Sequence, residues 1–405
     1  MTTTAPSDTA PSFPMEREGR CPFDPPPSAR RIQHDEPITR VSISNGTTPW
    51  LVTRYDDARK VLADSRVSSD PSKSGYPAQA GGAEGQGSPV SFILMDDPDH
   101  ARLRRMVTAP FAVKRIEALR PRVQKVVDDL IDGLLSGPQP VDLVEAFALP
   151  VPSLVICELL GVPYADHDHF QENSSAIVRR TSTMDDRRAA LGALSTYLTQ
   201  LLEKKIEAPE EDLLSDLGAR VVDGELTLDE ASQMGVLLLI AGHETTANMI
   251  ALGTLALLEH PGELATLQEA PEPSHVASAV EELLRYLTIL HAGRRRVATA
   301  DIEIGDVTIH EGDGVIVAAD LGNRDEAVFE DPDRLDLTRN PRAHIAFGFG
   351  VHQCLGQPLA RMELQVVYGT LFRRIPTLRR AVELDEIPFK TDGTVYGVYE
   401  LPVAW

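Results

Sequence analysis

The chain has 405 residues, of which 42% are apolar and 25% are charged, and its formal net charge at pH 7 is −22. This composition is typical of a large globular protein, and the negative charge argues against nucleic acid or an anionic membrane as a general partner. The three cysteines are too few for a disulfide framework, no apolar run is long enough to span a membrane, and the N-terminus lacks the apolar part of a signal peptide. We therefore expect a cytoplasmic, monomeric protein.

The N-terminal part predicts a leader followed by a small β region. Residues 1–30 are rich in Pro, Ser and Thr, and we expect a flexible leader there. The segment 38–56 contains Asn45-Gly46, a preferred pair for a tight hairpin turn, between strand-forming residues. Residues 71–91 are rich in Gly, Pro and Ser without a period, which is typical of either a functional lid or a disordered segment, and we expect a lid that closes over the substrate.

The remainder of the chain predicts mostly helices. Residues 98–290 have almost entirely helical patterns, whereas 294–320 contains short strands separated by Gly-Asp turns. A last helix is predicted over 355–375, followed by a final hairpin within 385–403. With 31–405 as a single domain, the fold class is mainly α with a small β region.

A long helix near the middle of the chain carries an unusual polar stretch. It begins at Thr227-x-x-Glu230, a capping box, and its centre reads AGHETT, residues 241–246. Glu244 and Thr245 in an otherwise apolar helix carry a desolvation cost unless they have partners, and the small residues one turn earlier leave a groove for a ligand. The alternative interpretation is that both side chains face solvent.

A cysteine lies in a loop built of small residues, FGFGVHQCLG, at 347–356. Pro358 and the apolar spacing that follows predict that a helix begins just after Cys354. The positive partial charge of a helix N-terminus favours a thiolate over a thiol. The loop is therefore suited to hold an anionic sulfur at an open face.

Two further pairs are unremarkable when each is taken alone. Glu282 and Arg285 stand at i, i+3 and can pair on one helix face, which is ordinary on a protein surface. His100 and Arg104 stand at i, i+4, where they could bind an anion or form a solvated basic face.

Taken together, these segments resemble the cytochrome P450 superfamily, most closely its soluble bacterial, actinomycete-type members. Phe347-x-x-Gly350-x-His352-x-Cys354-x-Gly356 satisfies the haem-loop signature at each defining position. The stretch AGHETT matches the oxygen-activation segment of the central helix. The resemblance extends from the hairpin near residue 41 to the terminal ELPVAW.

Glu282-x-x-Arg285 matches the helix motif that pairs with a later arginine in this family. The resemblance identifies that arginine as Arg334 in DPDRL, where Leu335 replaces the usual aromatic residue. It implies the cytochrome P450 fold, with haem buried between the central helix and the helix after the cysteine loop.

The implied cofactor is haem b, iron protoporphyrin IX, with Cys354 as the thiolate ligand of the iron. The loop glycines would let backbone amides approach the sulfur, and cationic or hydrogen-bonding side chains would bind the two propionates. The residues implied in cofactor binding are His100, Arg104, Ala241, Arg296, Phe347, Gly348, His352, Cys354 and Gly356.

The resemblance also implies a monooxygenase that uses O2. Gly242 would leave room for dioxygen, while Glu244 and Thr245 would relay protons to it. Electrons would come from a ferredoxin and its reductase, because the chain contains nothing similar to a flavin or iron–sulfur domain. We expect a basic dock for the ferredoxin formed by Arg105, Arg115, Arg361 and Arg374. The alternative is that these arginines only balance neighbouring acids.

By analogy with the family, an apolar pocket would receive a hydrophobic secondary metabolite, a macrolide-like molecule or a xenobiotic. Its expected wall is formed by Phe92, Val236, Ile240, Ile289, Leu290 and Val395. A haem-thiolate ligand-binding or sensor protein without turnover is the alternative function. A nucleotide-binding loop and a zinc site at Cys354 lack the further residues that each requires.

Overall fold

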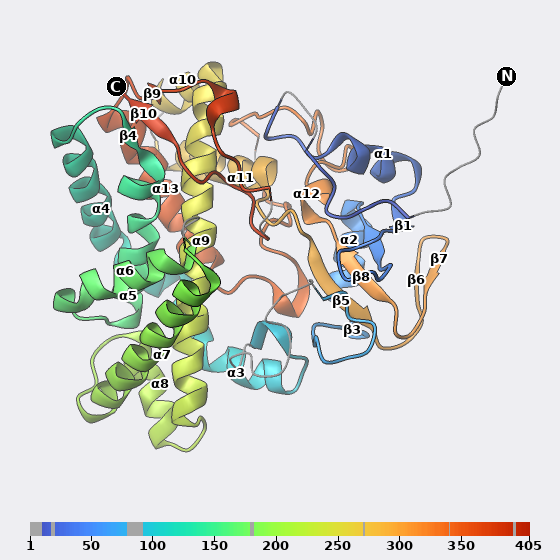
Figure 1. Cartoon of the computed structure of the whole chain (residues 1–405), viewed down its shortest axis with the longest axis horizontal. Helices are drawn as coiled ribbons and strands as arrows, with labels where there is room; N and C mark the ends of the chain where they lie inside the picture. Colours follow the sequence, from blue (N-terminus) through green and yellow to red (C-terminus); the bar gives the residue numbers. More distant parts are fainter. Residues whose placement is uncertain are drawn as a thin grey trace.

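A computed structural model describes residues 10–17, 21–78, 92–178, 182–269, 272–339, 341–391 and 394–405. A long central helix, α9 (Leu228–Glu259), runs through the molecule. Figure 1 shows a layer of helices on one side of α9 and a small β-sheet on the other. The fold class expected from the sequence is therefore confirmed.

The central helix begins at the predicted capping box. The Thr227 hydroxyl accepts from the Glu230 backbone N–H at 3.1 Å, and the Glu230 carboxylate accepts from the Thr227 N–H at 2.8 Å. Most of the helix beyond this cap is buried. By length and composition α9 could cross a membrane, but 67% of its most apolar window lies inside the protein, as in the core helix of a globular fold.

The helical part of the molecule consists of elements that pack on α9 directly or on one another, and in Figure 1 α3 and α11 lie on the side of α9 that faces the sheet. They are α3 (Asp99–Thr108), α4 (Val113–Ser136), α5 (Pro150–Leu160), α6 (His167–Val178), α7 (Met184–Glu207), α8 (Leu213–Val222), α10 (Pro261–Glu269), α11 (Pro273–Leu287) and α13 (Gln357–Arg374). Helix α13 packs against α4, α9 and α11, so the helix after the cysteine loop is part of the core. Three shorter helices, α1 (Pro27–Asp35), α2 (Tyr55–Ala63) and α12 (Ala319–Gly322), lie with the sheet (Figure 1).

The main sheet has the order β1-β2-β8-β5-β3. Its strands are β1 (Ile38–Arg40), β2 (Trp50–Val52), β8 (Gly314–Val317), β5 (Arg294–Ala298) and β3 (Val67–Ser68). The predicted hairpin is present, since β1 pairs with β2 and Gly46 has a φ of +83° in the turn between them. Successive side chains of a strand alternate between faces, so Arg294 and Arg296 share one face of β5 and Arg295 takes the other.

The end of the chain differs from the predicted hairpin within 385–403. Strand β10 (Pro402–Ala404) pairs with β4 (Val141–Asp142) and β9 (Arg379–Arg380). Among the described residues of 385–403, the two arms are joined by an isolated bridge between Phe389 and Val398. A separate hairpin contains β6 (Ile302–Ile304) and β7 (Val307–Ile309). Local patterns cannot reveal a strand partner some 260 residues earlier in the chain.

Part of the expected flexible leader is packed on the sheet. The Phe13 N–H donates to the Ser42 carbonyl at 2.8 Å, and the Phe13 side chain is only 6% exposed among Val41, Leu51 and Ile316. The expectation of a leader over 1–30 is therefore wrong for this part, because one buried aromatic residue produces no periodic signal. Residues 1–9, and residues 79–91 of the expected lid, lie outside the described residues.

Glu282 and Arg285 form a buried ion pair in place of a surface pair. Both side chains are 0% exposed, and Arg285 donates to both carboxylate oxygens of Glu282, at 2.7 and 2.8 Å. Arg285 also donates to the backbone carbonyls of Asn323, Pro332 and Arg334. The pair therefore fixes the end of α11 to the segment that precedes the cysteine loop.

The later arginine of this motif is Arg339, which corrects the prediction of Arg334. The Arg339 Nε lies 3.2 Å from Glu282 Oε1. The Arg334 side chain is exposed, and only its carbonyl reaches Arg285, because the turn after Asp331 directs backbone oxygens inward. Sequence position alone did not distinguish the two arginines.

We predict that Arg285→Leu destabilises the protein by about 3–5 kcal/mol, because it leaves the Glu282 carboxylate buried without its main partner. Arg334→Leu should change the free energy of unfolding by less than about 0.5 kcal/mol, because its side chain is exposed. Denaturant unfolding of both variants measures the difference. Equal losses would contradict the assignment of the network to Arg339.

Candidate active site

The cysteine loop is held in a tight conformation directly before α13. The Cys354 N–H donates to the Phe347 carbonyl at 2.8 Å, and Gly356 is the N-cap of the helix. Gly350 has a φ of +74°, and a β-carbon there would lie 2.3 Å from the Leu62 carbonyl oxygen. Only glycine fits at that position, so the glycine spacing of the loop follows from its close approach to α2.

The electrostatic surroundings of Cys354 differ from those of the other two cysteines. Burial raises the pKa of the Cys354 thiol, while the Gly356 N–H and the charges of Arg294 and Arg104 oppose that rise. Burial also raises the pKa of Cys157, with no cation to oppose it. Although Cys354 lies deep in the fold, its surface is accessible, so it borders an internal space.

Basic and imidazole side chains gather beside this loop. The rings of His100 and His352 lie 4.1 Å apart, centroid to centroid. His100 Nε2, His352 Nδ1 and Arg294 Nη1 are buried and have no hydrogen-bond partner among the described residues. Burial, and then the nearby Arg296 charge, lower the pKa of His352 to about 3. Burial also lowers the pKa of Arg294 to about 10.

Buried polar atoms in folded proteins nearly always have partners, so these unpartnered atoms mark a place for an anionic group. A haem fits this donor set, since its iron can take the Cys354 sulfur and its two propionates can accept from the basic cluster. Of the residues implied in propionate binding, His100, Arg296 and His352 belong to the cluster. Arg104 is adjacent, and its guanidinium donates to the Gln353 carbonyl at 2.6 Å.

Arg294 is a member of the cluster that the sequence analysis missed. It donates to the Ala346 carbonyl at 2.8 Å, and Gly348, with a φ of +78°, lets it lie against the loop. A signal was available, since Arg294 stands two residues before Arg296 on a strand and therefore on the same face. Phe347, also in the loop, lies under the Arg361 guanidinium at 4.6 Å.

On the opposite side of the site, α9 presents an accessible face. Ile240 and Ala241 are exposed, although the residues on either side of this stretch are mostly buried. The Thr245 hydroxyl donates to the Ala241 carbonyl at 2.8 Å, a bond that competes with the helical ladder. A β-carbon at Gly242 would lie in van der Waals contact with Ile156 on α5, at 3.6 Å, so the groove expected at this glycine stays a prediction.

Glu244 has a partner that was not predicted. Lys390, from the segment near the C-terminus, places its Nζ 3.9 Å from Glu244 Oε1, and the Lys390 side chain is mostly buried. Asn248 donates to the Glu244 carbonyl at 2.8 Å. Glu244 is thus neither simply solvated nor fully buried, and a basic group lies within reach of its carboxylate.

A second acid lies below the same helix. Glu363 on α13 is buried, hydrogen-bonds to Thr246, and leaves its Oε2 without a partner among the described residues. Burial raises the pKa of Glu363 to about 8, so the carboxyl is mostly protonated at neutral pH. The sequence offered a signal for it, since an acid stands on the apolar face of α13 between Leu359 and Val367.

The residues predicted for the substrate wall divide into two groups. Phe92, Val236 and Ile289 are buried, and the Phe92 ring lies 6.5 Å from that of His100. Leu290 and Val395 are half-buried, and Ile240 is exposed. The accessible members are therefore the ones available to touch a ligand, and the buried members support them.

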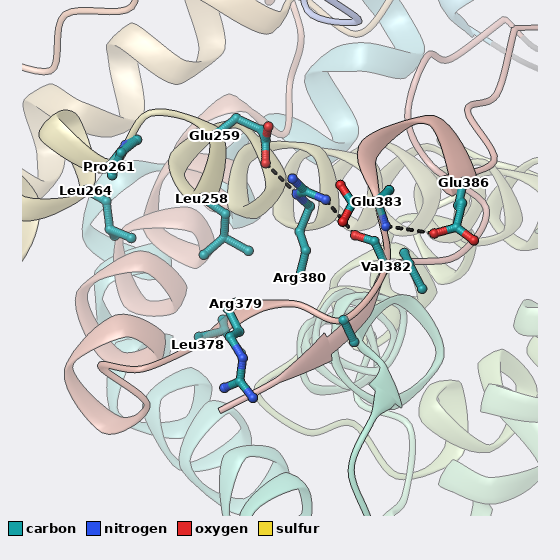
Figure 2. Close-up of a pocket in the computed structure, with 11 residues that line it drawn as sticks. Leu258, Glu259, Pro261, Leu264, Leu378, Arg379, Arg380, Val382, Glu383 and Glu386 are labelled. Carbon is teal, nitrogen blue, oxygen red and sulfur yellow. Dashed lines mark hydrogen bonds and ion pairs between the residues drawn. The ribbon is translucent and has the colours of Figure 1, made fainter.

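A groove that is open to solvent lies elsewhere on the protein. Figure 2 shows it at the C-terminal end of α9, beside β9, with about 1010 Å³ of empty space. The Arg380 guanidinium crosses it to Glu259 at 2.5 Å. Glu259 follows Glu244 by 15 residues on one helix, about 22 Å along the axis. This groove is therefore separate from the cysteine site.

Most of the expected basic dock is neutralised by acids of the same chain. Arg115 pairs with Asp216 at 2.7 Å, and Arg374 pairs with Asp128 and Asp132 at 3.0 and 2.5 Å. Arg361 donates to both oxygens of Glu281. Arg105 is exposed and forms no ion pair with any residue that the structure describes. The alternative interpretation of these arginines therefore holds for three of the four.

Comparisons with known proteins agree with this geometry. A sequence model of the family described as Cytochrome P450 matches residues 274–379. Cytochrome P450 GfsF of Streptomyces halstedii is 53% identical over 404 residues, covering 99% of this chain and 97% of that protein. The crystal structure of GfsF superposes with a TM-score of 0.94 and covers 98% of this chain and 100% of that chain.

Two more distant relatives have names that state a reaction. Pentalenic acid synthase of Streptomyces avermitilis is 47% identical and covers 100% of both chains. The crystal structure of mycinamicin VIII C21 methyl hydroxylase MycCI from Micromonospora griseorubida, bound to mycinamicin VIII, is 41% identical in sequence. Its TM-score is 0.88, and the match covers 98% of this chain and 100% of that chain.

We predict that Glu363→Gln becomes progressively more stable than the wild type as the pH rises from about 5 to about 8. In this range the carboxyl ionises in the unfolded chain but stays protonated in the fold, so the wild type loses stability with rising pH and the amide does not. Unfolding midpoints across this range measure the effect, with Glu303→Gln on the exposed edge of β6 as the control. A pH-independent difference for Glu363→Gln would contradict the raised pKa.

Proposed function

The chain belongs to the cytochrome P450 family and is a monooxygenase of that family, and we propose that it oxidises a hydrophobic secondary metabolite, a macrolide-like molecule or a xenobiotic. The reaction is hydroxylation or epoxidation with one atom of O2. The observation that carries the proposal is the accessible Cys354 sulfur beside buried donors that lack partners among the described residues. The alternative, ligand binding without turnover, is not favoured, because Glu244 and Thr245 lie together on the accessible face of α9.

We assign haem b to the space between α9 and α13. Cys354 would ligate the iron, and His100, Arg294, Arg296 and His352 would hold the propionates. When bound, this group activates dioxygen, so that one oxygen atom enters the substrate and the other leaves as water with two electrons and two protons. The role of the protein is to bind the group, exclude water and supply protons.

Two side chains of α9 are suited to the proton supply. The Thr245 hydroxyl faces the accessible side of the helix, where its oxygen can accept a proton from water and pass on its own. The Glu244 carboxyl group, one residue earlier, would take up a proton from water and pass it on, and the Lys390 Nζ lies 3.9 Å from its Oε1. Protons therefore enter from the Glu244 side and reach the reaction site at Thr245 Oγ1.

The substrate class is supported by the named relatives and by the wall residues. Ile240, Leu290 and Val395 offer accessible apolar surface, and the relatives include a methyl hydroxylase whose crystal structure is bound to mycinamicin VIII. We propose that the protein works in the cytoplasm as a monomer and receives electrons from a ferredoxin served by a reductase. Arg105 is the member of the predicted dock that is exposed and forms no ion pair with the described residues, so we assign it to this partner.

We predict that the dithionite-reduced protein under carbon monoxide has the strongly red-shifted Soret band of a thiolate-ligated haem. Cys354→Ala should abolish this band, whereas Cys21→Ala should leave it unchanged, because Cys21 lies outside the site. Absorption spectra of the three purified proteins provide the measurement. A band at the imidazole-ligated position in the wild type, or no haem, would contradict the proposal.

We predict that Thr245→Val lowers the yield of oxidised product per O2 consumed by at least about tenfold and releases the difference as hydrogen peroxide. The physical reason is that valine keeps the side-chain volume and removes the hydroxyl that passes protons. The measurement uses a ferredoxin–reductase pair and a hydrophobic substrate found by a spin-state shift.

The control for that experiment is Thr266→Val on α10. Thr266 makes the same type of back-bond, to the Gly262 carbonyl at 3.1 Å, but lies on an exposed helix surface. Its substitution should leave the product yield unchanged. Full coupling in the Thr245 variant would exclude Thr245 from the proton supply.

A further inference from the structure

The N-terminal segment contacts an aromatic residue next to the substrate wall. The Arg17 guanidinium lies 4.0 Å from the centroid of the Tyr396 ring. Arg17 is itself fixed, because it donates to the Asp24 carbonyl at 2.5 Å. The Tyr396 hydroxyl donates to the Pro22 carbonyl at 2.9 Å, and Tyr396 is only 2% exposed. Residues of the N-terminal segment therefore hold the Tyr396 ring at its face, through Arg17, and at its hydroxyl group, through Pro22.

The backbone around Tyr396 contacts the two elements that form the reaction site. The Tyr396 N–H donates to the Ile289 carbonyl at 2.7 Å. The next residue, Gly397, lies directly on α9, where a β-carbon would come within 2.0 Å of Asn248 Oδ1. The Gly397 carbonyl accepts from the Lys390 N–H at 2.8 Å, and Lys390 is the partner of Glu244. Figure 1 shows this C-terminal segment crossing α9.

The wall segment after α11 needs such an anchor. Residues 288–291 belong to no helix or strand, and Thr288 has a φ of +33°, which is unfavourable for a β-branched residue. On one side the Asn323 amide donates to the Thr288 hydroxyl at 2.8 Å. On the other side, the Tyr396 N–H holds the Ile289 carbonyl. The position of Ile289 and Leu290 therefore depends on where Tyr396 lies.

We propose that Arg17 and Tyr396 form a positioning pair that sets the place of the 288–291 wall and of the 394–398 segment relative to α9, and thereby which part of a substrate is oxidised. The inference rests on the proposed function of this wall as the substrate pocket. Neither residue touches the reacting atoms. Their effect passes through the Tyr396–Ile289 hydrogen bond and the Gly397–Asn248 contact.

The charged groups around Arg17 support a fixed position for it. Burial lowers the pKa of Arg17, while Tyr396, Asp320 and Asp24 act in the opposite direction. Asp320 is buried, and its Oδ1 has no hydrogen-bond partner among the described residues. Removing the Arg17 charge would leave this acid without its largest opposing influence, because Arg17 is the first cation that lowers the pKa of Asp320.

The test uses the haem-loaded protein and two ligands of the iron. Imidazole is too small to reach the wall, whereas 4-phenylimidazole extends from the iron toward it. We expect Arg17→Leu to weaken the binding of 4-phenylimidazole about five- to tenfold, and the binding of imidazole by less than about twofold, as measured in Soret titrations. Arg17→Lys, which keeps a cation over the ring, should restore most of the loss.

A matched control is Arg31→Leu. Arg31 lies in the same part of the chain and is exposed, and its side chain makes no hydrogen bond or ion pair with residues in the described ranges. It should leave both affinities unchanged. Hydrogen exchange adds a direct readout of position: amides of 286–291 and 394–401 should exchange faster in Arg17→Leu and not in Arg31→Leu.

Three outcomes would overturn the proposal that Arg17 and Tyr396 form a positioning pair. They are unchanged binding of 4-phenylimidazole by Arg17→Leu, equal weakening of both ligands, or unchanged exchange in the two segments. If Arg17→Leu does not fold, Arg17→Lys and Tyr396→Phe carry the test, the latter keeping the ring and removing only the bond to Pro22. The carbon monoxide spectrum of the wild type decides the proposed function separately, so the two failures are distinguishable.

Discussion

Burial of side-chain nitrogen atoms that have no hydrogen-bond partner among the described residues is the constraint on which the site depends. Arg294 and Arg296 come from β5, His100 from α3 and His352 from the cysteine loop, and three of these four side chains keep an unpartnered buried nitrogen among the described residues. Such an arrangement carries a desolvation cost that only an anionic ligand can offset. Binding of a haem with two carboxylates and burial of these four side chains are therefore linked, and the apoprotein should be less stable than the loaded protein.

Asn323 connects the buried Glu282–Arg285 pair to the segments on both sides of the site. Asn323 accepts from Arg285 at its carbonyl, donates from its amide to Thr288, and accepts from the Ile345 N–H at its side-chain oxygen at 2.8 Å. Thr288 is the first residue of the 288–291 wall segment, and Ile345 lies two residues before the cysteine loop. One network thus sets both sides of the site, which explains why an ion pair with a large desolvation penalty is retained in the core.

The chemistry was predictable from the sequence because it is encoded in short spacings. The cysteine loop, the AGHETT stretch and the capping box at Thr227 each lie within ten residues, so local geometry determines them. Arg339, Lys390 and Arg17 were not predictable, because each meets its partner across 57 to 379 positions of the chain. No periodicity reports such contacts, and a Pro-rich segment such as 10–17 has no pattern that indicates burial.

The residues for the chemistry and the residues that select the substrate lie on different kinds of backbone. The groups that bind the cofactor lie on α3, β5 and the cysteine loop, and those that supply protons lie on α9. Hydrogen bonds and buried ion pairs hold these elements in place. The wall that meets the substrate lies on irregular backbone, whose anchors are Asn323 on one side and Tyr396 on the other. Tyr396 joins the two ends of the chain, because it lies near the C-terminus and contacts Arg17, which precedes it by 379 residues. Substitutions in the N-terminal segment can therefore alter the wall while the residues that bind the cofactor stay in place.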